Sequence, residues 1–216
     1  TLSGFANMKA LSKNNDNPQG ASRPFDKKRD GFILSEGAGF IFLEEMKHAL
    51  DRGANILGEI SGYGITNDAF HITQPHSEAV GAISAIKMAL DDSDLNENDI
   101  DYINAHGTST YFNDMLETKA IKKSFRNKAY DISISSTKSM TGHLLGAAGA
   151  IEAIICLNSI KDGVIPPTIN LKNKDEDCDL NYTPNKAVKK NVKISMNNSF
   201  GFGGHNSVII IKKFSS

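Results

Sequence analysis

A short strand and a polar loop meet in the segment Tyr102-Ile103-Asn104-Ala105-His106-Gly107-Thr108-Ser109-Thr110. Its apolar beginning is typical of a buried strand, and the small and hydroxyl-bearing residues that follow predict a loop. Next along the chain come a helix-like pattern over 114–126 and a strand-like run over 132–136. Strand, helix and strand in this order predict neighbouring strands of one sheet with a helix on its face.

The same alternation continues on both sides of this segment, from residue 56 onward. We expect further helices at 78–91 and 143–160, and further strands at 56–63, 164–169, 192–198 and 207–212. A glycine-rich turn joins the last two strands and predicts a hairpin. The chain is therefore predicted to have an α/β fold, with a parallel or mixed sheet covered by helices.

Residues 1–55 have a different pattern. An apolar run predicts a strand at 37–43, a helix is expected at 44–52, and a polar loop over 14–30 precedes them. A single strand cannot bury its own apolar side chains, so this one must join a sheet supplied by another part of the protein. We therefore assign residues 1–55 to the end of one domain and residues 56–216 to a second domain.

The composition excludes several classes of partner. The 216 residues include 24 Lys and Arg against 25 Asp and Glu, which gives a net charge of -1. Without a basic excess the chain has no field that would hold a nucleic-acid backbone, so we predict no nucleic-acid partner. No apolar run reaches the ~18 residues of a membrane span and no signal-peptide pattern is present, so we predict a soluble, intracellular protein without a membrane partner.

Neither of the two cysteines has the surroundings of a nucleophile. Cys156 lies in the apolar run 151–157, which predicts a buried and inert thiol. Cys178 lies in the polar run 174–179, whose carboxylates would raise the pKa of a thiol. Two cysteines outside any Cys-x-x-Cys pair predict no disulfide framework and fit a reducing compartment.

Three predicted strands are each followed by a loop rich in polar or glycine residues: Asn104–Thr110, Ser136–His143 and Asn198–Asn206. In α/β folds, ligands bind beyond the carboxyl ends of strands, so we expect these loops to form one cleft. His106 alone is compatible with a buried, capped histidine, and His143 alone with the first residue of a helix. Together with Lys138, two histidines without neighbouring Cys or carboxylate ligands favour a charge-stabilising site over a zinc site, and we predict no metal.

The glycine-rich loop and Glu117 each allow two interpretations. The run 198–206 joins strand to strand, which argues against a dinucleotide-binding loop. It either directs backbone N–H groups toward a developing oxyanion or forms only a tight hairpin. Glu117 either belongs to a capping box that begins with Asp114 or brings a carboxylate to the His106 loop.

At these three loops the sequence resembles the β-ketoacyl-acyl-carrier-protein synthases, and most closely the type II elongating enzymes of fatty-acid synthesis. The resemblance rests on Asn104–Thr110, Lys138–Gly149 and Asn198–Gly204, and it extends through Arg23–Asp26, Arg29–Phe32 and Pro166–Leu171. It implies the C-terminal half of a thiolase-like fold, a mixed five-stranded sheet covered by helices, preceded by the end of the N-terminal half.

The resemblance also implies roles for individual residues. His106 and His143 would donate hydrogen bonds to the malonyl thioester carbonyl while decarboxylation turns it into an enolate. Lys138 would order the site electrostatically, while Phe202 would place its N–H in an oxyanion hole and its ring at the acyl pocket. The substrate-binding residues implied are Thr108 and Thr110 at the pantetheine arm, Asp68, His71 and Thr73 at the entrance, and Phe200 and Gly201. The supporting residues implied are Glu117, Glu152 and Asn198.

The sequence departs from the family pattern in two places. His205 stands where many bacterial members have Thr, although plastid-type and some actinobacterial members also have His, and we predict no third catalytic histidine. No Thr-Ala-Cys motif is present, although the family's nucleophilic cysteine lies in such a motif in the N-terminal half. We therefore expect this chain to hold the histidine and lysine part of the site and to form no acyl-enzyme by itself.

The resemblance implies as partners an acyl carrier protein, an N-terminal half that bears the cysteine, and a second subunit in a homodimeric complete enzyme. No cofactor is implied, because the carrier protein brings its own phosphopantetheine, and Lys9 matches a basic contact position for that acidic partner. The location implied is the cytoplasm of a bacterium or a plastid-type organelle. The alternatives are an inactive truncated remnant, a non-catalytic partner subunit, and a polyketide-type ketosynthase fragment, although polyketide enzymes usually have Glu-Ala-His-Gly-Thr-Gly-Thr at the His106 loop.

Overall fold

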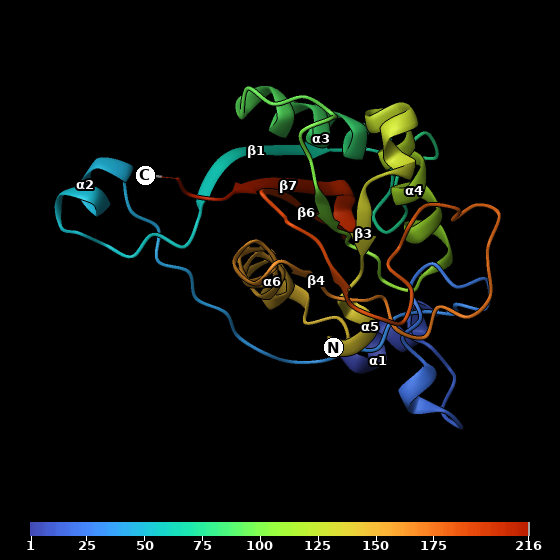
Figure 1. The fold of residues 1–216 in the computed structure, drawn as a ribbon. Helices are drawn as coiled ribbons and strands as arrows, with labels where there is room; N and C mark the ends of the chain where they lie inside the picture. The colour runs from blue at the N-terminus through green and yellow to red at the C-terminus, as the bar shows by residue number, and fades with distance from the viewer. Residues whose placement is uncertain (216) are drawn as a thin grey trace.

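One mixed sheet of five strands organises the computed structural model, which describes residues 1–215 (Figure 1). Across the sheet the strands are β1 (Glu59–Asn67), β7 (His205–Lys212), β6 (Ile194–Gly201), β2 (Tyr102–Asn104) and β3 (Ser133–Ser135). β7 is antiparallel to β1 and β6, whereas β2 is parallel to β6 and β3. The mixed five-stranded sheet and the closing hairpin are thus confirmed.

Helices cover both faces of this sheet (Figure 1). α3 (Val80–Asp92) and α4 (Tyr111–Phe125) pack on one face and α6 (Ala148–Asp162) on the other. The shorter helical elements are α1 (Leu2–Asn7), α2 (Met46–Asp51), α5 (Lys138–Thr141), η1 (Pro18–Gly20), η2 (Arg126–Tyr130), η3 (Leu145–Ala147) and η4 (Phe202–Gly204). Among residues 1–215, none of these helices has the length and apolar character needed to cross a membrane.

Neighbouring residues of the central strands point to opposite faces of the sheet and build two cores. On β2, Ile103 packs in the core beneath α3 and α4, while Tyr102 packs in the core against α6, and both are fully buried. Because β2, β3 and β6 run in the same direction, their carboxyl ends meet at one edge of the sheet. The three loops singled out in the sequence begin at this edge.

Two predicted elements differ from the structure more than by a shift of their ends. The helix expected over 143–160 begins later, because His143 lies outside any helix, η3 covers 145–147 and α6 starts only at Ala148. Gly142 reverses the chain there with φ of 69°, and a Cβ at this position would lie 3.0 Å from the carbonyl oxygen of Ile33. The strand expected over 164–169 is confined to β4 (Val164–Ile165), which pairs with β5 (Val188–Lys189) in a separate short ribbon.

The strand predicted over 37–43 is wrong. These residues belong to no strand of the described chain, and α2 follows them at 46–51 instead of 44–52. A strand needs a hydrogen-bonding partner, and no strand of residues 1–215 pairs with this segment. Phe40, Phe42 and Leu43 consequently expose 88%, 99% and 70% of their surface.

We expect Ile103→Ala to lower the free energy of unfolding by about 2–5 kcal/mol, because the substitution leaves a cavity in the centre of the sheet. The matched control is Leu57→Ala, whose side chain is already largely exposed and for which we expect a change within about 0.5 kcal/mol. Urea denaturation followed by circular dichroism measures both. Equal losses for the two variants would contradict the placement of Ile103 in the core.

Candidate active site

The loops after β2, β3 and β6 open into one cavity of about 730 Å³. Nine of the predicted site residues line it: His106, His143, Thr108, Thr110, Asp68, Thr73, Phe200, Gly201 and Phe202. Lys138, Glu117, Glu152 and Asn198 are buried and lie outside this lining, as does His71. The convergence predicted from the strand ends is therefore present in the structure, while the roles of these residues stay predictions.

His106 follows β2 and is buried. Gly107 turns the chain after it with φ of 37°, and a Cβ there would come within 2.4 Å of the Ser136 side chain. Burial, together with the charges of Lys138 and His143, lowers the pKa of His106 well below its usual value. The imidazole is therefore neutral, and its Nδ1 atom has no hydrogen-bond partner within residues 1–215.

The Glu117 side chain joins three elements beneath this loop. Its carboxylate accepts hydrogen bonds from the backbone N–H groups of His106 (2.8 Å) and Gly107 (2.7 Å) and from the Asn198 side-chain amide (3.1 Å). Burial raises the pKa of Glu117 to about 7, while these three donors oppose the rise. α4 begins at Tyr111, before Asp114, so the capping-box interpretation is wrong and the carboxylate instead serves the His106 loop.

His143 is held by the N-terminal segment of the chain. Its backbone N–H donates to the carbonyl oxygen of Ile33 (2.7 Å), and its own carbonyl oxygen accepts from the N–H of Ser35 (3.1 Å). Its Nδ1 accepts from the N–H of Leu145 (3.1 Å), so the neutral ring carries its proton on Nε2. Burial, together with the charge of Lys138, lowers the pKa of His143 to about 4.

The two imidazoles lie together at the cavity. Their ring centroids are 5.4 Å apart and their planes are nearly perpendicular, at 84°. Phe32 packs edge-to-face on His143 at 5.1 Å, and Phe200 packs on His106 at 6.1 Å. Both rings are neutral, so each can donate one N–H to an oxygen that develops negative charge.

Lys138 forms a buried ion pair with Glu152 from α6. Ser22 fixes the backbone of this lysine, because its hydroxyl donates to the Lys138 carbonyl oxygen at 2.6 Å. Burial raises the pKa of Glu152, and the charge of Lys138 opposes the rise. The structure thus pairs Lys138 with Glu152, whereas Glu117 contacts the His106 loop.

The glycine-rich turn between β6 and β7 presents Phe202 at the cavity, with 47% of its surface exposed. The loop after β1 holds this turn through two backbone hydrogen bonds. The N–H of Gly203 donates to the carbonyl oxygen of Ile72 (2.8 Å), and the N–H of Asp68 donates to the carbonyl oxygen of Gly204 (2.8 Å). His71 shapes that loop, since its Nδ1 accepts from the backbone N–H groups of Thr73 and Gln74, both at 3.1 Å. His205 is exposed and contacts Asn67, and it is not among the residues that line the cavity.

The hydroxyls of Thr108 and Thr110 lie 2.9 Å apart in the cavity lining. Between them, Ser109 has φ of 69°, a left-handed conformation that side chains rarely adopt. The relative placement of the two threonines therefore depends on the interactions that stabilise this conformation of Ser109.

Apart from Lys9, the contribution of residues 1–36 to the lining was not predicted from the sequence. Phe5, Met8, Ala10 and Phe32 all line the cavity, and Lys9 lies among them. The motifs at 23–26 and 29–32 belong to the family resemblance, but the resemblance implied no role in the site for their residues.

Both thiols are poor nucleophiles. Burial raises the pKa of Cys156 and of Cys178 to about 12. The burial predicted for Cys156 is confirmed, and so is the raised pKa predicted for Cys178, where desolvation is the largest cause and the Asp114 and Asp175 carboxylates add to the rise. Within residues 1–215, no three His, Cys, Asp or Glu side chains come together as a metal site would require.

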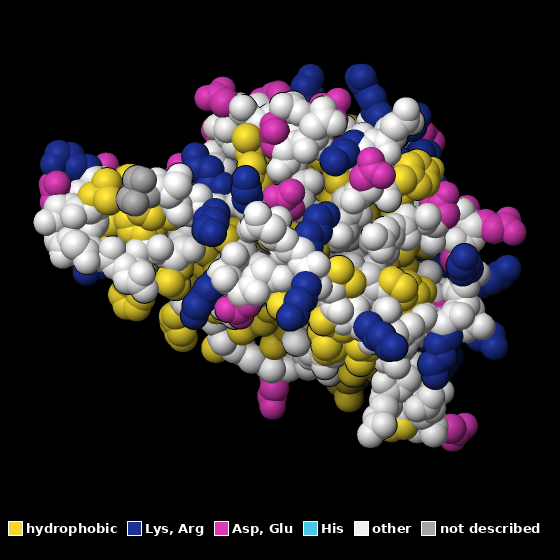
Figure 2. All heavy atoms as spheres, in the orientation of Figure 1, with side chains coloured by type: hydrophobic (Ala, Val, Ile, Leu, Met, Phe, Trp, Pro, Cys, Tyr) yellow, Lys and Arg dark blue, Asp and Glu magenta, His cyan; other side chains and the backbone are white. Residues whose placement is uncertain are grey.

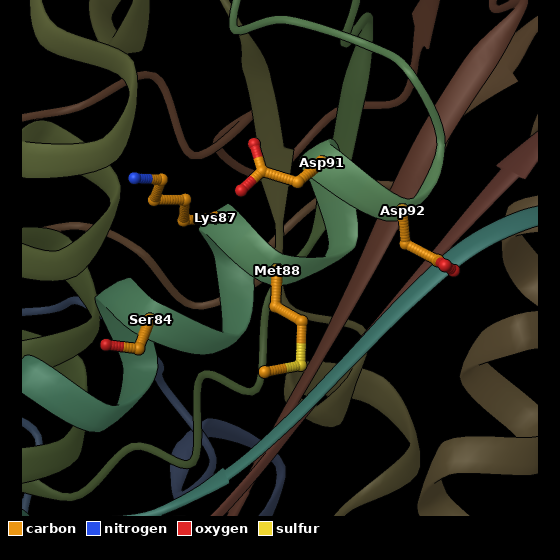
Figure 3. Close-up of a pocket in the computed structure, with 5 residues that line it drawn as sticks. All are labelled: Ser84, Lys87, Met88, Asp91 and Asp92. Carbon is orange, nitrogen blue, oxygen red and sulfur yellow. The ribbon is translucent and has the colours of Figure 1, made fainter.

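A second, more open depression of about 440 Å³ lies on the outer face of α3. Its lining is Ser84, Lys87, Met88, Asp91 and Asp92, all from this one helix (Figure 3). Asp92 is already engaged, because its carboxylate accepts from the N–H of Tyr63 at 3.0 Å. None of the predicted site residues lines this depression, so the cavity at the strand ends is the candidate site.

Two family models match the chain. Residues 57–172 match the beta-ketoacyl synthase, C-terminal domain, and residues 1–49 match the beta-ketoacyl synthase, N-terminal domain. A solved structure described as a type II PKS acyl-carrier protein in complex with its ketosynthase bound to the hexaketide superposes with a TM-score of 0.96 at 40% identity, over 99% of this chain and 53% of that one. The predicted fold class, part of a thiolase-like fold, is confirmed.

Curated relatives carry one description. The chain is 54% identical to the 3-oxoacyl-(acyl-carrier-protein) synthase 2 of Synechocystis sp., over 99% of this chain and 51% of that protein. It is 51% identical to the synthase of the same description from Coxiella burnetii, over 98% of this chain and 51% of that protein. The chain therefore spans about half the length of the curated relatives it matches.

The raised pKa of Glu117 predicts a pH-dependent effect of Glu117→Gln on stability. Between pH 4.5 and 7 the folded protein keeps a proton that the unfolded chain has lost. This stabilising contribution is present below pH 4.5 and is lost as the pH rises through about 7. The variant lacks this contribution at every pH. Its free energy of unfolding relative to that of the parent should therefore rise by up to about 3 kcal/mol between pH 4.5 and 7.

Urea denaturation at several pH values measures this difference, with Glu176→Gln on the exposed loop as the control for residue type. A constant difference between Glu117→Gln and the parent, reflecting only the lost acceptor, would contradict the titration of Glu117 in this range.

Proposed function

Because the chain belongs to the β-ketoacyl synthase family, we propose that its cavity is the decarboxylating part of a 3-oxoacyl-acyl-carrier-protein synthase site. The complete enzyme lengthens an acyl chain by two carbons in fatty-acid synthesis and releases CO₂. The pair of neutral imidazoles at the cavity, 5.4 Å apart, is the observation that carries this proposal.

The chemistry requires an electron sink. Decarboxylation of a malonyl thioester breaks the bond between the carboxylate carbon and C2, and the electron pair moves onto the thioester oxygen as an enolate. Hydrogen-bond donors aimed at that oxygen lower the barrier, more so in a site that excludes water. His143 offers Nε2–H because Leu145 engages its Nδ1, and His106 supplies the second donor. The enolate carbon then attacks an acyl thioester, forms the new C–C bond and expels the thiolate.

Lys138 keeps these donors in the correct state. Its charge, added to burial, lowers the pKa of both histidines, so protonation does not convert them to imidazolium. The buried partner Glu152 holds the ammonium in place. We therefore assign Lys138 to positioning and electrostatics and the two histidines to contact with the substrate.

A substrate carried on phosphopantetheine fits the rest of the lining. Thr108 and Thr110 offer hydroxyl donors and acceptors for the amides of such an arm, and Lys9 at the cavity suits an acidic carrier protein. The solved neighbour is described as a carrier protein in complex with its ketosynthase, which supports the same partner here. No further cofactor is needed, because the arm arrives on the carrier.

The nucleophile of the complete enzyme belongs, in this proposal, to the part of the relatives that this chain does not cover. Both thiols of residues 1–215 are buried, with pKa values of about 12. The same missing part would cover the exposed side chains of Phe40, Phe42 and Leu43. We propose that the complete enzyme is a homodimer.

The test is malonyl-carrier-protein decarboxylation and condensation by two proteins: the chain of 216 residues alone, and a chimera with the first half of the Synechocystis synthase fused before Thr1. We expect condensation only from the chimera. His106→Ala and His143→Ala in the chimera should each reduce CO₂ release by about 100-fold or more, because each removes one oxyanion donor.

The matched control is His48→Gln on α2, whose side chain is exposed and lies outside the cavity; it should leave the rate unchanged. Decarboxylation that survives both alanine substitutions would contradict the roles proposed for the histidines. A folded chimera without any turnover would instead support a non-catalytic remnant or partner subunit.

A further inference from the structure

The guanidinium of Arg29 is fully buried and joins three segments of the chain. Its Nη1 donates to the carbonyl oxygen of Asp26 (3.0 Å) and pairs with the Asp175 carboxylate in the loop before β5. Its Nε and Nη2 donate to the carbonyl oxygens of Thr110 (3.3 Å) and Tyr111 (3.1 Å), where α4 begins. One side chain thus fixes the beginning of α4 from outside the cavity.

Charge and aromatic contacts complete the surroundings of this guanidinium. The Asp114 carboxylate, also fully buried, lies 3.7 Å from its Nε, and the Tyr111 ring lies 5.1 Å from its Cζ. A buried cation is tolerated only when it is paired, and two carboxylates meet that requirement here. The planar fork of Arg reaches these acceptors at once, which the single ammonium of Lys cannot do.

The backbone around Arg29 holds the neighbouring turn in addition. The N–H of Gly31 donates to the carbonyl oxygen of Ser109 (2.9 Å), and the N–H of Arg23 donates to the Ser109 hydroxyl (3.1 Å). These bonds stabilise the left-handed conformation of Ser109. Thr108 and Thr110 flank this residue. Backbone N–H groups of the segment 23–31 therefore hold Ser109, and the Arg29 side chain holds the carbonyl oxygens of the two residues that follow it.

We propose that Arg29 is a positioning residue for the Thr108–Thr110 hydroxyl pair and, through that pair, for the pantetheine arm of the substrate. The second step rests on the function proposed above. Arg29 does not line the cavity, so its effect reaches the substrate only through the geometry of the turn. Its loss should therefore weaken substrate binding and leave the chemical step at the histidines intact.

The first test needs no activity. Amide hydrogen exchange of the chain alone compares the parent with Arg29→Lys and with the milder variant Asp175→Asn. We expect exchange at 108–113 to accelerate about tenfold in both variants and to stay unchanged in β6 and β7, because only the anchored turn is released. Arg126→Lys, an exposed residue at the other end of α4, is the matched control. Unchanged exchange at 108–113 in both variants would overturn the proposal.

The second test separates binding from chemistry in the chimera described above. Arg29→Lys should raise KM for malonyl-carrier protein by about tenfold with kcat within about twofold. In a Thr108→Val, Thr110→Val background the same substitution should have no further effect on KM, because the groups it positions are gone. A loss of kcat, or additive effects on KM, would show that Arg29 acts elsewhere. An unsubstituted chimera without turnover would count against the proposed function, while the exchange experiment still decides the positioning role.

Discussion

The geometry of the cavity depends most on the hydrogen bonds that the Glu117 carboxylate accepts. This carboxylate accepts hydrogen bonds from the loop after β2 and from Asn198 on β6, so a residue of α4 ties together two of the three strand ends. A buried carboxylate is costly, and only multiple donors make it tolerable. Loss of one donor would leave a buried carboxylate oxygen of Glu117 with fewer hydrogen bonds. Because the same carboxylate accepts from His106 and from Asn198, the orientation of the His106 loop is coupled to the position of β6.

A second constraint is electrostatic. Two imidazoles and one ammonium share a desolvated region, so the three cannot all be charged at modest cost. Lys138 has a carboxylate partner in Glu152, whereas among residues 1–215 neither histidine has one, so the lysine is paired and both rings are neutral. Glu152 therefore holds in place the cation that, together with burial, lowers the pKa of both rings. Figure 2 shows Lys and Arg side chains spread over one face together with Asp and Glu side chains, and the net charge of the whole sequence is only -1, so no strong excess of one sign is added to this local balance.

The sequence predicted the parts of the fold that depend on local pattern. The loop at 104–110 and the turn before β7 could be placed because strand ends of one direction must meet at one edge of the sheet. The run 37–43 could not, because its apolar pattern indicates an extended chain without saying whether a partner strand exists. Arg29 could not either, since its acceptors at 110, 111 and 175 are distant in sequence and no periodicity links them. Cys178 shows the same limit: the neighbouring carboxylates predicted the raised pKa of its thiol, but the burial that contributes most to the rise comes from tertiary packing.

Residues of both predicted domains line the cavity, so the N-terminal segment contributes to the candidate site as well as to the fold. Ile33 and Ser35 hold the backbone of His143, Phe32 packs on its ring, and Gly31 anchors the turn of Thr108 and Thr110. These contacts reach both histidine-bearing loops from one short stretch of chain. A protein that began only where the regular alternation of strands and helices starts would have the same sheet, but His143 and the threonine pair would lose the hydrogen bonds that orient them. The segment 1–36 is therefore a structural component of the site itself, and the exposed run 37–43 is the place where the chain leaves it.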